Sequence, residues 1–165
     1  MIKPKPLKPG LGEESVWDYP RPPTVELANK SIQIYFAGVK IADTHRAWRV
    51  LETSHPPVYY LPPADIRMGC LTPAGGGSWC EWKGQANYYN IEFEDQSAKR
   101  AAWTYSRPTP SFGVIKDHIA FYAWAMDRCL ADGELVRPQP GTFYGGWITK
   151  EIIGPFKGEP GSAGW

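Results

Sequence analysis

Apolar and polar residues alternate over several short stretches of the chain, and a period of two is typical of β-strands with one buried face. In SIQIYFAGVKIADT, residues 31–44, apolar residues occupy alternate positions on both sides of Gly38. The pattern predicts a hairpin with its turn at Gly38. Further strands are expected in RAWRVLE (46–52), PPVYYL (56–61), MGCLTP (68–73), CEWKGQANYYNIEFE (80–94, as two strands joined near Gly84) and KRAAWTYSRP (99–108).

Two other stretches do not show a simple alternation of apolar and polar residues. We expect AGGGS, residues 74–78, to be a loop, because glycine carries no side chain to pack in a sheet. In VIKDHIAFYAWAMDRCL, residues 114–130, apolar residues recur at helical spacing, but HIAFY within it also fits a strand. We expect a strand near residues 118–123 and a helical turn after it. CLADGELV then predicts a second hairpin with Asp132-Gly133 in its turn.

Composition divides the chain into three regions. Residues 1–29 form a proline-rich N-terminal arm. Its prolines lack a backbone N–H, so this arm cannot form a helix or a central strand. Trp17 and Tyr19 would anchor it across the domain or across a neighbouring subunit, and the latter would make a homo-oligomer. A partly disordered tail is the alternative. Residues 30–137 form a mainly β domain with little helix. Residues 138–165 form a glycine- and aromatic-rich C-terminal extension without a regular helix, packed on the same domain.

Charge and cysteine usage limit the partners. The formal charge of +1 over 165 residues gives no general attraction for nucleic acid or for an anionic membrane. No stretch has the apolar length of a membrane span, and the N-terminus lacks the apolar core of a secretory signal. Cys70, Cys80 and Cys129 are an odd set without CxxC spacing, so we expect free thiols and a reducing cytoplasm.

The sequence offers weak support for metal or phosphate chemistry. His45, His55, His118 and the cysteines lack the close spacing of zinc ligands, so we expect no metal and no cofactor. Gly77-Ser78 followed by Glu92 and Glu94 only loosely fits a nucleotidyl-transfer site, which needs carboxylates that hold two metal ions. Alternating glutamates on the solvent face of a strand explain the pattern better. AGGGS also lacks the lysine and hydroxyl ending of a P-loop.

Cys80 is a candidate nucleophile, since a cation near a thiol lowers its pKa. Lys83 lies three residues further on, and positions i and i+3 of a strand face opposite sides. Direct activation therefore requires a bend at Gly84. A buried structural cysteine is the simpler interpretation.

The eight tryptophans and nine tyrosines either fill a β-rich core or line a binding surface. Polar and amphipathic side chains on the expected strands favour a small-ligand pocket with aromatic walls and few charges. The candidate ligand-binding residues are Glu52, Tyr60, Lys83, Tyr88, Trp103 and Tyr105. Lys83 and Glu52 would form an ion pair or an acid/base pair if they converge. Scattered surface side chains are the alternative.

Four stretches in this order, RVLETSHPPVYYLPPADI, CEWKGQANYY, AAWTYSRP and IKDHIAFY, resemble the bacterial family called domain of unknown function 427. The resemblance spans roughly residues 30–137, and the tail from Gly141 is similar to an extension in part of that family. It implies a tent-like arrangement of antiparallel sheets. Relatives of similar fold bind zinc or small ligands, but this chain lacks the paired cysteines of the zinc-binding ones. The family has also been labelled nucleotidyltransferase-like, which the missing two-carboxylate motif does not support here.

The positions that match the family are Glu52, Pro57, Tyr59, Tyr60, Cys80, Lys83, Gly84, Tyr88, Trp103, Tyr105, Pro108, Phe121 and Tyr122. Backbone geometry and core packing explain the prolines, Gly84 and Phe121. For the polar and aromatic positions we hypothesise one shared cavity, in which Lys83 binds an anionic or carbonyl group and Glu52 orients it.

Three functions fit these residues. The first is a cytoplasmic β domain that binds a small polar or anionic ligand. The second is an enzyme that acts on a small polar substrate through Lys83 or Cys80, with Glu52 as a further catalytic candidate. The third is an interaction module that uses the proline-rich arm.

Overall fold

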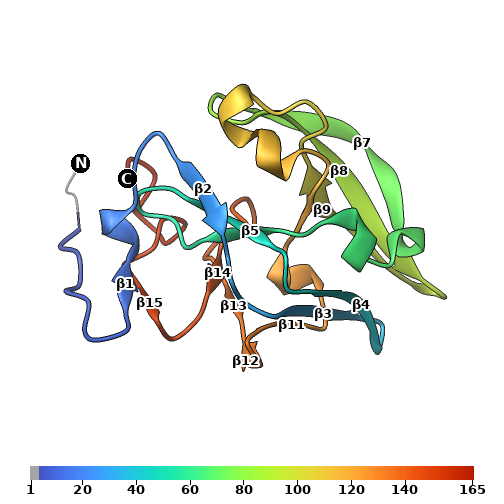
Figure 1. Ribbon diagram of the computed structural model, residues 1–165, viewed down its shortest axis with the longest axis horizontal. Coiled ribbons are helices and arrows are strands. Elements are labelled where there is room, and N and C mark those ends of the chain that lie inside the picture. The colour runs from blue at the N-terminus through green and yellow to red at the C-terminus, as the bar shows by residue number, and fades with distance from the viewer. Residues whose placement is uncertain (1–3) are drawn as a thin grey trace.

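The structure, a computed structural model, describes residues 4–165 of the chain. Strands dominate it, which confirms a mainly β fold of antiparallel sheets with little helix. The long strands lie at one end of the molecule and both termini at the other (Figure 1). Within residues 4–165 no helix is long and apolar enough to cross a membrane.

Two four-stranded antiparallel sheets form the frame of the fold. The first has the order β10-β9-β8-β7, and the second has the order β12-β11-β3-β4. The strands of the first sheet are β7 Leu71–Cys80, β8 Gly84–Phe93, β9 Gln96–Thr104 and β10 Ile119–Phe121. Those of the second are β3 Ile32–Phe36, β4 Val39–Thr44, β11 Arg128–Ala131 and β12 Glu134–Leu135.

Both predicted hairpins of the second sheet are present. β3 and β4 pair across Ala37 and Gly38, and β11 and β12 pair across Asp132 and Gly133. Each of these four turn residues has a positive φ. Two-residue turns of that kind match the right-handed twist of the strands they join, and glycine adopts them without strain.

The remaining strands form three smaller sheets. A three-stranded sheet has the order β2-β5-β6, β15 pairs with the N-terminal β1, and β13 pairs with β14. The strands are β1 Glu14–Ser15, β2 Thr24–Leu27, β5 Trp48–Leu51, β6 Val58–Tyr60, β13 Arg137–Pro138, β14 Trp147–Ile148 and β15 Ile152–Ile153. Short 3-10 helices connect them: η1 Val16–Asp18, η2 Pro63–Asp65, η3 Met68–Cys70, η4 Pro110–Ile115 and η5 Ala123–Ala125.

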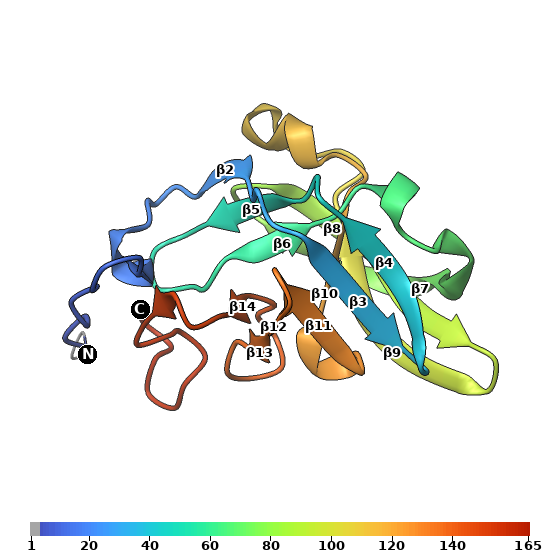
Figure 2. The same cartoon turned by 60° about the horizontal axis from the view of Figure 1, so that its bottom comes forward.

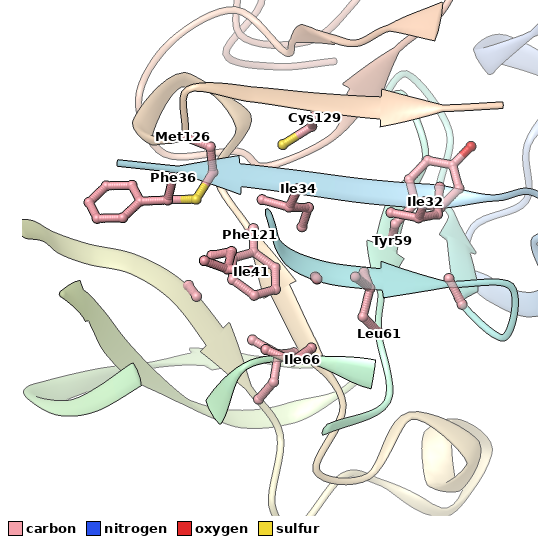
Figure 3. Close-up of a cluster of buried hydrophobic side chains, with 14 of the residues drawn as sticks. Ile32, Ile34, Phe36, Ile41, Tyr59, Leu61, Ile66, Phe121, Met126 and Cys129 are labelled. Carbon is pink, nitrogen blue, oxygen red and sulfur yellow. The ribbon is translucent and has the colours of Figure 1, made fainter. Parts of the chain in front are cut away.

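The main core lies where the two four-stranded sheets meet. Ile32 and Ile34 of β3 and Phe121 of β10 are fully buried there, and Figure 3 shows them gathered with neighbouring apolar side chains. A second cluster, built mostly of rings, lies on the other face of β9 and β10. Ala120 belongs to this cluster, although its neighbours in β10 belong to the main core, because successive strand residues face opposite sides.

Two sequence-based predictions are wrong at the start of the first sheet. AGGGS is not a loop but part of β7, whose register shifts between Pro73 and Gly77. β7 is an edge strand, where a bulge can accommodate glycines. MGCLTP is a strand only from Leu71, because Met68–Cys70 forms η3. In residues 114–130, by contrast, β10 and η5 are the expected strand and helical turn.

The N-terminal arm packs on its own chain. β1 pairs in parallel with β15, and Trp17 Nε1 donates to the Pro155 carbonyl at 2.9 Å. Tyr19 is buried and donates to Glu14, whose carboxylate also accepts from Arg49. Residues 24–27, within the proline-rich region, form the edge strand β2 beside β5.

The C-terminal residues also pack on the domain, and Figure 2 shows β13 and β14 close to β6. Trp147 is buried, and its backbone N–H donates to the Pro57 carbonyl at 2.8 Å. Its indole Nε1 donates to the Phe121 carbonyl at 3.1 Å. Residues 138–165 contain no regular helix, as expected.

Because Ile34 is fully enclosed, Ile34→Ala should lower the free energy of unfolding by about 2–5 kcal/mol, the usual cost of deleting a buried side chain of this size. Urea unfolding measures the loss. Leu135→Ala, at a side chain that is 60% exposed, is the control and should cost under about 1 kcal/mol. Equal losses for the two variants would contradict the assigned core.

Candidate functional site

A cavity of about 470 Å³ opens between the β7–β10 sheet and strands β5 and β6, with C-terminal residues closing one side. All six predicted ligand-binding residues line it: Glu52, Tyr60, Lys83, Tyr88, Trp103 and Tyr105. The candidate nucleophile Cys80 lies in the same wall. The structure thus brings together residues that are up to 53 positions apart in the chain, counting from Glu52 to Tyr105.

Strand alternation explains how the rings reach this cavity. Tyr59 of β6 belongs to the main core, so its neighbour Tyr60 faces the other way, into the ring cluster. Trp103 of β9 and Tyr105, which directly follows the strand, are two positions apart and belong to the same cluster. Tyr88 of β8 is the direct pairing partner of Trp103.

Nine aromatic side chains line the cavity: Tyr60, Trp79, Trp82, Tyr88, Trp103, Tyr105, Tyr122, Phe143 and Tyr144. Several are fixed by polar contacts at their edges. Trp103 Nε1 donates to the Tyr60 hydroxyl at 3.3 Å, and the Trp103 and Tyr122 ring centroids are 4.7 Å apart. Tyr122 in turn donates to the Phe143 carbonyl at 2.7 Å. These contacts hold the rings of the cavity walls in fixed positions before any ligand binds.

Burial raises the pKa of the Tyr60 and Tyr105 phenols, and it raises the pKa of Tyr122 to about 12. The phenols are therefore neutral at neutral pH. They provide ring faces and hydroxyl groups to a ligand, but no negative charge.

The turn between β7 and β8 places Lys83 in the wall. Gly84 has a φ of +108°, and a side chain there would meet the Arg107 carbonyl at 3.2 Å. Thr109 fastens the turn, since its N–H donates to the Lys83 carbonyl at 3.0 Å and its hydroxyl donates to the Trp82 carbonyl at 2.6 Å. This is the bend that the Cys80 and Lys83 spacing requires for the two side chains to share one cavity.

Lys83 carries the positive charge of this wall. Burial alone would lower the pKa of its ammonium, but polar neighbours that include the Glu52 carboxylate outweigh burial, so the pKa lies above its ordinary value. Its Nζ lies 5.8 Å from the centre of the Tyr105 ring. Within residues 4–165, Lys83 forms no salt bridge with a carboxylate. The Lys83 ammonium in the cavity therefore has no salt-bridge partner among the carboxylates of the described residues.

Glu52 lines the cavity, but its carboxylate contacts residues other than Lys83. Its Oε2 lies 3.7 Å from Arg21 Nε and 3.7 Å from His55 Nε2. The expected direct pair with Lys83 is thus absent from the contacts of residues 4–165, although the Glu52 charge still favours the Lys83 ammonium.

Gln139 holds the histidine beside Glu52. This amide is 1% exposed, and its Oε1 accepts from Gly146 N at 3.0 Å. Its Nε2 donates to the Lys157 carbonyl at 2.8 Å and to His55 Nδ1 at 3.0 Å. Since Nδ1 is an acceptor, the neutral ring carries its hydrogen on Nε2, toward Glu52. Burial, together with the charges of Lys157 and Arg21, lowers the pKa of His55 to about 3.

Two glycines bring the C-terminal segment against the pocket. A side chain at Gly145 would meet Trp103 at 2.1 Å, and one at Gly146 would meet the Pro56 carbonyl at 2.5 Å. Sequence reasoning missed Gln139, Phe143, Tyr144, Gly145 and Lys157 as lining residues. The only sequence signal for them is the Gly-Gly pair among aromatic residues, which indicates close backbone approach.

The other candidate chemistries lie elsewhere. Glu92 and Glu94 are exposed and do not line the cavity, although Ser78 does. His45 and His118 are also outside it. Residues 4–165 contain no group of three or more His, Cys, Asp and Glu side chains placed to hold a metal ion. Cys70, Cys80 and Cys129 are free, and only Cys80 reaches the cavity.

A protein family described as a domain of unknown function, DUF427, matches residues 24–132. The chain belongs to the DUF427 family. The family model carries the label NTP_transf_9. No curated protein matches the chain. The DUF427 match includes β2 through β11 and so covers the predicted site residues, while Gln139, Phe143, Tyr144 and Lys157 lie beyond it.

Gly145→Ala should displace the C-terminal segment, because the added methyl overlaps a Trp103 ring that Tyr60 and Tyr122 hold in place. We expect a loss of about 1–3 kcal/mol in the free energy of unfolding, as for other overpacked sites, and a change in tryptophan fluorescence. Gly113→Ala is the control, since a methyl group added at Gly113 would meet nothing within 4 Å. Unchanged stability and fluorescence in Gly145→Ala would contradict the close approach.

His55 should make the protein less stable in mild acid. The unfolded chain takes up a proton near the ordinary pKa of 6.5, whereas the folded chain does so only near 3. The stabilisation is therefore complete above pH 6.5 and decreases as the pH falls toward 3. From pH 7.5 to 5 we expect wild type to lose about 1–2 kcal/mol more than His55→Gln. Urea unfolding at each pH measures this, with the exposed His45→Gln as control; parallel losses in wild type and His55→Gln would disprove it.

Proposed function

We propose that the protein binds a small organic anion, with the anionic group on the Lys83 ammonium and a flat apolar body against the surrounding rings. One observation carries the proposal: Lys83 is a cation in a ring-lined cavity, and no carboxylate of residues 4–165 pairs with it. Lys83 is half-buried, and a charge that is partly removed from water is stabilised when a counter-charge accompanies it. A ligand carboxylate or phosphate would supply that charge.

The cavity supports a ligand of modest size. Its volume of about 470 Å³ lies within the range of small-molecule sites, which are mostly apolar with a few placed polar groups. Rings such as Trp103 and Tyr105 offer faces for stacking, and Ser78 and Gln139 offer polar contacts at the wall.

The protonation states favour binding over proton transfer. Lys83 is an ammonium rather than a free amine, so it attracts anions and does not act as a base or as a Schiff-base nucleophile in this state. The Nδ1 lone pair of His55 is occupied by Gln139. The phenols are neutral. Each of these groups is suited to hold a ligand in place.

Benzoate and benzamide test the proposal, because they have the same shape and differ in charge. In an NMR titration of the full chain, benzoate should bind more tightly than benzamide. Lys83→Met should weaken benzoate binding by roughly 10- to 100-fold, the value of a hydrogen bond to a charged group, and should leave benzamide binding nearly unchanged.

Lys116→Met is the matched control, since Lys116 is exposed and does not line the cavity. It should bind benzoate as wild type does. Equal benzoate affinity in wild type and Lys83→Met would refute the proposed role of Lys83.

A further inference from the structure

We propose that Arg100 forms a second cationic subsite next to the pocket, and that the ligand is an elongated dianion with a flat apolar middle. This proposal rests on the proposed function, because it extends the same ligand beyond the Lys83 end. One anionic group would lie on Lys83, and the other would lie on the Arg100 guanidinium.

A second cavity adjoins the first. It has a volume of about 500 Å³ and is lined in part by Lys99 and Arg100. The two cavities share four lining residues: Ser78, Tyr88, Tyr122 and Phe143. A ligand can therefore pass from one to the other along a common wall of rings.

The backbone holds Arg100 in an unusual conformation. Its φ is +50°, which is costly for a residue with a side chain, and its N–H donates to Asn90 Oδ1 at 2.9 Å. The register between β8 and β9 shifts between Tyr89 and Ile91, next to this contact. Bulges of this kind redirect side chains beside binding sites.

The guanidinium is also positioned by its neighbours. Its Cζ lies 4.1 Å from the centre of the Tyr88 ring, and Nη1 donates to the Gly75 carbonyl at 2.7 Å. Gly75 belongs to the bulged part of β7, so two irregular strands hold one arginine. Among residues 4–165 no carboxylate forms a salt bridge with Arg100. Its remaining N–H groups are available to a carboxylate or phosphate, which the planar fork matches well.

The two cations lie at opposite ends of a ring wall. Lys83 immediately precedes β8, and Tyr88, on which Arg100 stacks, is the fifth residue of that strand. Lys83 and Tyr88 are five positions apart, which corresponds to about 16 Å along an extended strand. The ligand that fits this arrangement is longer than a single ring. Its middle would lie against Tyr88, Tyr122 and Phe143, the residues that both cavities share.

Two matched probes test the second subsite: a biphenyl dicarboxylate with one carboxylate at each end, and the biphenyl monocarboxylate of the same length. In NMR titrations of the full chain, the dicarboxylate should bind wild type about 10-fold more tightly than the monocarboxylate. Arg100→Met should reduce that ratio to about one. Arg100→Lys, which keeps the charge but loses the planar fork, should give an intermediate ratio, and Lys116→Met should keep the wild-type ratio.

The outcomes separate the two proposals. If the monocarboxylate binds in a Lys83-dependent way and the ratio is near one in wild type, the second subsite is wrong and the first stands. A ratio that stays near ten in Arg100→Met also overturns the role of Arg100, which then only covers the Tyr88 ring. If neither probe binds wild type, both proposals fail.

Discussion

The β7–β10 sheet is covered on both faces, and this constraint shapes the rest of the molecule. In β10, Ile119 and Phe121 enter the main core while Ala120 between them enters the ring cluster. In β6, likewise, Tyr59 enters the main core and Tyr60 enters the ring cluster. One face is thus filled mainly by aliphatic side chains, together with rings such as Phe121 and Tyr59, that pack closely. The other is faced by large rings, and between those rings the cavity remains.

The cavity depends on the C-terminal segment as much as on the sheet. Gly145 and Gly146 allow this segment to approach Trp103 and Pro56 closely, and the Gln139 amide ties it to His55 through hydrogen bonds that use both its N–H groups and its carbonyl oxygen. A buried polar network that is fully satisfied specifies one arrangement. Within that fixed frame no carboxylate of residues 4–165 forms a salt bridge with Lys83, and the proposed anion binding rests on this ammonium.

Local patterns predicted much of this structure. The alternation around Gly38 and the Asp132-Gly133 turn each specify a hairpin within a few residues, and both hairpins are present. The loop prediction for AGGGS was wrong because Gly77 and Ser78 pair with β8 and residues 74–76 form a bulge within the edge strand β7. The rings and Lys83 could be selected as site candidates from their chemistry. Gln139 and the role of His55 could not, because their contacts join residues that are 84 positions apart.

A crystal structure of the full chain with saturating benzoate tests the central claim most directly. We predict a carboxylate within hydrogen-bond distance of Lys83 Nζ and an aromatic ring against the walls that Tyr60, Trp103 and Tyr105 form. The contrary result is a cavity without benzoate in which the Lys83 ammonium closes onto Glu52. That structure would show an internally neutralised pocket with no need of a ligand anion.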